Sequence, residues 1–109
     1  MNKTEHLLAC VAEECGEVQQ AVGKCLRFGI LDTGPMTDKT NSAQLRNEIH
    51  DLIAVYQMLC DVLGESSELD VRVIDLKKDR VLKFMEHARQ VGTLESEITG
   101  ERESEGRKA

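Results

Sequence analysis

The chain is poor in aromatic and basic residues. Among its 109 residues are no Trp, one Tyr and two Phe, and 20 acidic residues outnumber 14 Lys and Arg, which leaves a formal net charge of −6. A nucleic-acid-binding surface needs a basic stripe and usually stacking aromatic side chains. The composition therefore disfavours nucleic acid as a partner and predicts an aliphatic core.

Long apolar runs and paired cysteines are also missing. No apolar stretch reaches the roughly 18 residues of a membrane span, and no secretory signal opens the sequence. We therefore expect a cytoplasmic protein with no membrane partner. The four cysteines form no C-x-x-C pair and lie in helical stretches, which is typical of reduced core thiols rather than disulfides or thiolate metal sites: Cys10, Cys15, Cys25 and Cys60.

Three stretches have apolar residues at helical spacing. We expect helices over residues 4–28, 42–63 and 71–91, with Thr4 and Ser42 as N-caps and a glycine after each helix. The only proline, Pro35, lies in residues 29–40, which we expect to form a loop. The predicted fold class is all-α, with one domain over residues 1–94 and a polar, disordered tail over 95–109. Helices this apolar favour self-association.

Two clusters of carboxylates interrupt the first two apolar stretches: Glu13-Glu14-x-x-Glu17 and Glu48-x-x-Asp51. In a helix the first three acids fall within an arc of about 100°. Glu14 lies inside the apolar stripe of its helix, and Glu48 lies near the middle of the next stripe. Buried carboxylates without a cation would protonate or cost several kcal/mol. The pattern predicts a metal site formed by Glu14, Glu17, Glu48 and Asp51, against the alternative of salt-bridged helix faces.

The ligand type narrows the choice of metal. An all-oxygen set suits Mg²⁺, Mn²⁺ or Ca²⁺. The Glu-x-x-His pairs of a di-iron bundle and the alternating acids of a calcium loop are both absent. Mg²⁺ is the best fit, with Mn²⁺ as a possible substitute, and Mg²⁺ sites usually take some of their ligands from substrate phosphates.

These motifs resemble the E-E-x-x-E…E-x-x-D signature of the MazG-like, all-α nucleoside triphosphate pyrophosphohydrolases. The segments EECGEVQQAVGKCLRFG and LRNEIHDLIAVYQML are similar to the small single-domain versions common in phages and prophages, and KKDRVLKFMEHARQVGTL resembles their third helix. The resemblance covers about residues 3–94. It implies a bundle of three main helices that a homodimer or homotetramer completes, in a bacterial cell or encoded by a phage.

The resemblance also implies an activity, the hydrolysis of a (deoxy)nucleoside triphosphate to its monophosphate and pyrophosphate. The residues alone support metal-assisted phosphoryl chemistry. Glu13 or Glu17 is the expected general base, because these acids are least tied to the apolar stripe.

Basic side chains could hold the phosphates. The alternative for the two residues of the first helix is a surface side chain paired with a neighbour. For Lys78 it is a snorkelling side chain at an interface, and for Arg80 and Lys83 a solvated helix face. Two of these residues follow the first acidic cluster and three lie in the third helix: Lys24, Arg27, Lys78, Arg80 and Lys83. Asn47 flanks the second cluster and could bind a base edge, or it could simply face solvent.

Two functions of other classes stay open. One is a non-catalytic helical oligomer in which a structural divalent cation supports an interaction module. The other is a metal-storage or redox bundle, which the missing histidine ligands weaken.

Overall fold

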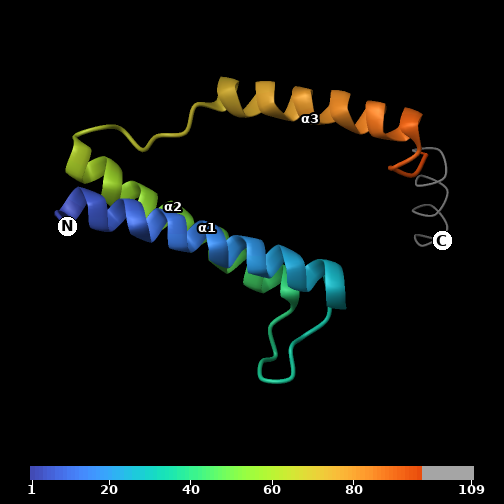
Figure 1. Ribbon diagram of the computed structural model, residues 1–109, viewed down its shortest axis with the longest axis horizontal. Coiled ribbons are helices and arrows are strands. Elements are labelled where there is room, and N and C mark those ends of the chain that lie inside the picture. Colours follow the sequence, from blue (N-terminus) through green and yellow to red (C-terminus); the bar gives the residue numbers. More distant parts are fainter. Residues whose placement is uncertain (97–109) are drawn as a thin grey trace. The chain divides into compact units, whose positions relative to one another are not determined.

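A computed structural model of the chain describes residues 1–96, and these contain three helices and no strand. The helices are α1 (Lys3–Phe28), α2 (Asn41–Leu63) and α3 (Val71–Val91), as Figure 1 shows. The all-α fold class predicted from the sequence is confirmed. The chain divides into two compact units, residues 1–67 with α1 and α2, and a second unit from residue 68 onward with α3. Most of the predicted tail, residues 97–109, lies outside the described residues.

The helix boundaries agree with the predicted ones to within two residues. Each helix is followed by a glycine with positive φ, and Gly64 and Gly92 adopt the left-handed conformation that residues with a Cβ seldom reach. The two predicted N-caps were wrong. Asn2 caps α1 by accepting from the Glu5 amide at 2.8 Å, and Thr40 caps α2 by accepting from the Ala43 amide at 3.1 Å. Both caps lie two residues before the expected ones.

Helices α1 and α2 lie side by side as an antiparallel hairpin (Figure 1). Its buried residues form two groups at opposite ends of the hairpin. Leu7 of α1 and Leu59 and Cys60 of α2 are buried at the end where α1 begins, and Ala21 and Asn41 are buried near the loop. The middle of the hairpin lies between these two groups.

Apolar side chains of the hairpin are exposed, among them a thiol that the sequence placed in the core. Cys15 on α1 is exposed, and Tyr56 on α2 is 43% exposed. The reason is geometric, because one neighbouring helix covers only one side of α2 and leaves its flanks open. Of the four cysteines, Cys60 alone is buried.

Residues 29–40 form a loop, as predicted, and it folds back onto the start of α2. The Asn41 amide donates to the Asp32 carbonyl oxygen at 2.9 Å, and the Ser42 amide donates to the Ile30 carbonyl oxygen at 3.0 Å. These bonds satisfy two amides that a helix N-terminus leaves without intrahelical partners. The loop is thereby held against the end of the hairpin where α1 ends and α2 begins.

Candidate metal centre

Helix α1 contributes Glu14 to the middle of the hairpin. Glu14 lies seven residues after Leu7 and seven before Ala21, the two buried residues of α1. Seven residues are two helical turns, so all three side chains lie on the face that packs against α2. A carboxylate therefore occupies a position that the spacing otherwise gives to a core residue, and Glu14 is half-buried there.

Helix α2 contributes Glu48 and Asp51 to the same point. Three residues apart, they are neighbours on one face of the helix. Glu48 is half-buried and Asp51 is exposed. One carboxylate oxygen from each of Glu14, Glu48 and Asp51 lies within 4.8 Å of the others. Three of the four predicted metal ligands therefore meet in space.

The dimensions of this acidic cluster, which we define as Glu14, Glu48 and Asp51, suit one divalent ion. Two oxygens on opposite sides of a Mg²⁺ ion are about 4.2 Å apart, and about 5 Å apart for Ca²⁺. Oxygens that all lie within 4.8 Å of one another span a single coordination sphere. Among residues 1–96 no basic side chain forms an ion pair with any of the three acids. The cluster carries negative charge that the described part of the chain does not balance.

The pKa of Glu14 reflects the unbalanced negative charge of the cluster. The pKa of Glu14 is raised above its usual 4.5, first by desolvation and then by the charges of Asp51, Glu48, Glu13 and Glu17, in decreasing order. Each of these effects disfavours the ionised carboxylate. A bound cation would reverse them by favouring the ionised form.

The other two predicted acids lie around the cluster rather than in it. Glu13 and Glu17 are exposed residues of α1, and neither supplies an oxygen to the group within 4.8 Å. Both are close enough to raise the pKa of Glu14. Their carboxylates are therefore near the cluster and open to solvent.

The predicted basic residues occupy different surroundings. Lys24 lines a cavity beside the loop, and the guanidinium of Arg27 lies 5.0 Å from the centre of the Phe28 ring, a cation–π distance. The three basic residues of α3 are exposed side chains of the second unit: Lys78, Arg80 and Lys83.

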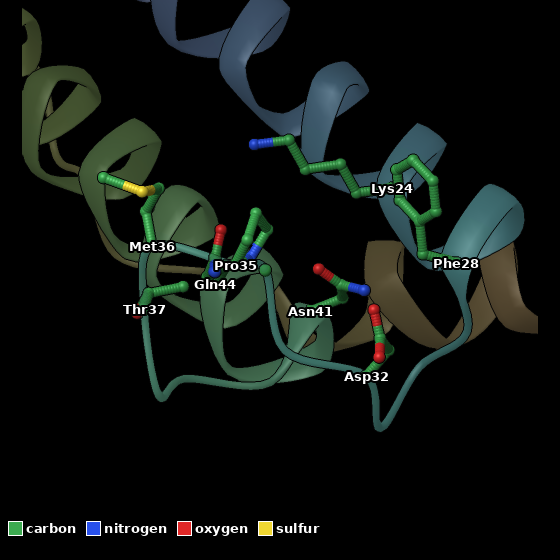
Figure 2. A pocket seen from close by; sticks show the side chains of 9 residues that line it. Lys24, Phe28, Asp32, Pro35, Met36, Thr37, Asn41 and Gln44 are labelled. Carbon is green, nitrogen blue, oxygen red and sulfur yellow. The ribbon is translucent and has the colours of Figure 1, made fainter.

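The cavity beside Lys24 has a volume of about 320 Å³ and is shown in Figure 2. The three elements of the hairpin that line it are α1, the loop and α2, through Lys24, Phe28, Asp32, Pro35, Asn41 and Gln44 among others. Sequence reasoning missed the last four, because only the folding of the loop brings them together. Asn47, the predicted base-binding residue, is exposed and does not line this cavity.

Comparison with known proteins agrees with the geometry. The family model of the MazG nucleotide pyrophosphohydrolase domain matches residues 2–89, which include both helices of the acidic cluster. No curated protein and no solved structure is significantly similar to the chain. Among the described residues, no helix is long and apolar enough to cross a membrane. From its match over most of its length, the chain belongs to the MazG nucleotide pyrophosphohydrolase family, hydrolases that act on nucleotides and generally depend on a divalent metal.

Proposed function

We propose that the protein hydrolyses (deoxy)nucleoside triphosphates to the monophosphate and pyrophosphate with the help of Mg²⁺, for which Mn²⁺ can substitute. The observation that carries this proposal is the acidic cluster, three carboxylates from two helices within 4.8 Å of one another that have no cationic partner among residues 1–96. Family membership supports nucleotides as substrates. Oxygen-only ligands favour a hard cation.

In this proposal Glu14, Glu48 and Asp51 hold the ion, and Glu17, one turn along α1, completes the set. When bound, the ion neutralises charge on the phosphates and makes water a better nucleophile. Glu13 or Glu17 accepts a proton from the attacking water, since both are exposed beside the cluster. The water oxygen bonds to the α-phosphorus, and the bond from that phosphorus to the pyrophosphate oxygen breaks.

Basic side chains position the phosphates that the cluster would otherwise repel. Lys24 and Arg27 lie on α1 beyond Glu17, two to three turns from it along the same helix. Lys78, Arg80 and Lys83 offer further positive charge from α3. Arg binds phosphate oxygens through a fork of donors, and Lys acts as a point charge.

We also propose that the protein works as a homodimer or homotetramer. The hairpin buries only four apolar residues, and α3 buries none. Large apolar side chains are exposed in both units, such as Leu26 at 83% and Phe84 at 70%. Each apolar side chain of this size gains about 1.5–3 kcal/mol when it is fully buried. A second copy of the chain has the same exposed apolar faces and would cover them.

The test is pyrophosphate release from a panel of the common NTPs and dNTPs with Mg²⁺. Glu48→Gln and Asp51→Asn should each lower kcat at least about 100-fold. Losing a residue that only supports a metal ligand costs up to about 100-fold, and losing a ligand itself should cost at least as much. Asp61→Asn is the matched control, because Asp61 is an exposed acid on α2 outside the cluster. The proposal is wrong if the folded wild-type protein releases no pyrophosphate from any nucleotide with Mg²⁺ or Mn²⁺.

A further inference from the structure

The cavity beside the loop begins one helical turn from the acidic cluster. Gln44 precedes Glu48 by four residues and Asn41 precedes it by seven, which places them about 6 Å and 10 Å along the axis of α2. A nucleotide whose phosphates lie at the cluster would therefore extend its sugar and base along the hairpin toward this cavity. The inference below rests on the proposed function and concerns the base.

Asn41 is the decisive residue of the cavity. It is 3% exposed, and its side-chain nitrogen donates to the Gly29 carbonyl oxygen at 2.8 Å. Because only the amide nitrogen can donate, this bond fixes the orientation of the amide. The amide oxygen then has no hydrogen-bond donor among the described residues. In Figure 2 it points toward the side of the cavity where Pro35 and Gln44 lie. Because this oxygen is open to the cavity, a donor from water or from a ligand can pair with it.

Gln44 also has an amide nitrogen bonded to a backbone carbonyl oxygen, but its bond is longer than that of Asn41. Its side-chain nitrogen faces the Lys39 carbonyl oxygen at 3.5 Å, and its oxygen points toward the cavity in Figure 2. Asp32 adds a carboxylate, which can only accept when it is ionised. Asn41, Gln44 and Asp32 are hereafter the acceptor set of the cavity.

The remaining wall can hold an aromatic ring. Phe28 presents an exposed ring at the end of α1, and Lys24 extends across the opening (Figure 2). Bases stack on aromatic rings whatever their identity, so Phe28 would hold a base without selecting it. Selection is then left to the acceptor set.

We propose that this cavity binds the base of the substrate and prefers bases with an exocyclic amino group, cytosine and adenine, over their oxo counterparts. Cytosine presents an amino donor where uracil and thymine present a carbonyl acceptor, and adenine does so where hypoxanthine presents one. An oxo group facing the acceptor set would leave acceptors unpaired and repel the Asp32 carboxylate. A matched base contact of this kind gives about 5- to 150-fold discrimination in kcat/KM, which corresponds to about 1–3 kcal/mol.

Two substrate pairs that differ only at that group test the proposal. In wild-type protein with Mg²⁺, dCTP should exceed dUTP in kcat/KM by at least about fivefold, and dATP should exceed dITP similarly. Gln44→Met and Asp32→Asn should each bring the dCTP to dUTP ratio toward one. Gln57→Met on α2 and Asp38→Asn in the loop are matched controls outside the cavity and should leave it unchanged. Circular dichroism checks that each variant is folded.

A second measurement needs no turnover. With EDTA present, titration of the full chain should show tighter binding of dCMP than of dUMP, and Gln44→Met should reduce the difference. If no nucleotide is hydrolysed, the proposed function fails while this titration still decides the base preference. The inference is overturned if hydrolysis occurs with a ratio near or below one. It is equally overturned if turnover is absent and dCMP binds no better than dUMP, or if Asn47→Ala removes a preference that Gln44→Met and Asp32→Asn leave intact.

Discussion

Glu14 of α1 and Asp51 of α2 hold carboxylate oxygens within 4.8 Å of each other across the helix pair. Two like charges at that distance repel each other, and the water around the exposed Asp51 carboxylate screens part of the repulsion. Glu48 adds a third charge at the same point. The repulsion disfavours the metal-free fold, so a cation that bound at the cluster as proposed would stabilise the folded chain.

Divalent cations should therefore raise the melting temperature. At a Mg²⁺ or Mn²⁺ concentration 100-fold above Kd, binding to the folded state alone stabilises it by about 2.7 kcal/mol. Differential scanning calorimetry of the wild type with and without EDTA measures the shift. Glu48→Gln should show most of the shift lost, whereas Asp61→Asn should keep it. An equal shift in all three proteins would contradict the acidic cluster as the binding site.

The stability of the metal-free protein should depend on pH through Glu14. Its pKa is raised above 4.5 in the folded state, so Glu14 contributes most to stability below pH 4.5, and the contribution is lost as pH rises through the raised value. Glu14→Gln keeps the neutral state at every pH. In EDTA at pH 7 the variant should be more stable to urea than the wild type, and the gap should close as pH falls toward 4.5.

Repeating the measurement on Glu14→Gln with Mg²⁺ provides a control. With saturating Mg²⁺ at pH 7 the order should reverse, because Glu14→Gln lacks a metal ligand that the wild type retains. A variant that is less stable than the wild type in EDTA at pH 7 would show that repulsion at Glu14 does not strain the fold.

Substitutions at Glu13 and Glu17 should distinguish a residue that binds the metal from one that accepts the proton. If one of them is the general base, replacing it with Gln lowers kcat by about 10²–10⁴-fold. The Mg²⁺-induced rise in melting temperature should survive in Glu13→Gln, because Glu13 is not among the proposed ligands of the ion. Loss of both properties in Glu17→Gln would assign Glu17 to the metal, and an unchanged kcat in both variants would remove them from the reaction.

Asn41 should be important for stability as well as for the base. Asn41→Ala removes the bond to the Gly29 carbonyl oxygen and leaves that oxygen without its donor, at a cost of about 1–3 kcal/mol in the free energy of unfolding. Ser42→Ala, at the next position, removes an exposed hydroxyl and should cost no more than about 0.5 kcal/mol. Urea unfolding of both variants measures the difference, and equal values would show that the bond contributes little.

Self-association should depend on the exposed apolar residues of α3. Phe84→Glu places a charge on a side chain that is 70% exposed and should shift the protein to a smaller species in light scattering after size exclusion. Gln90→Glu adds the same charge at an exposed polar position of the same helix and should leave the mass unchanged. A monomeric wild type, or an unchanged mass in Phe84→Glu, would contradict the proposed assembly surface.

Local signals in the sequence were enough to predict the helices and the acidic cluster. The glycines at 29, 64 and 92 end all three helices, and helical spacing alone brings Glu48 and Asp51 onto one face. Thr4 and Ser42 failed as caps because Asn2 and Thr40, two residues earlier, carry equally good acceptors, and propensity cannot choose between such neighbours.

The cavity beside the loop was beyond prediction for a different reason. Its acceptor set depends on bonds between residues far apart in the chain, above all from Asn41 to Gly29 and Asp32. In the sequence, Asn41 is an ordinary polar residue at the start of a helix. Only the structure shows that its amide nitrogen is bonded to the Gly29 carbonyl oxygen. Non-local contacts of this kind leave no periodic pattern in the sequence.

The loop between α1 and α2 lies where α1 ends and α2 begins, whereas the carboxylates lie in the middle of the helices. If the cavity selects the base as proposed, replacements within residues 30–40 would change the nucleotide preference and leave the carboxylates in place. New preferences would then arise from the exchange of one short loop.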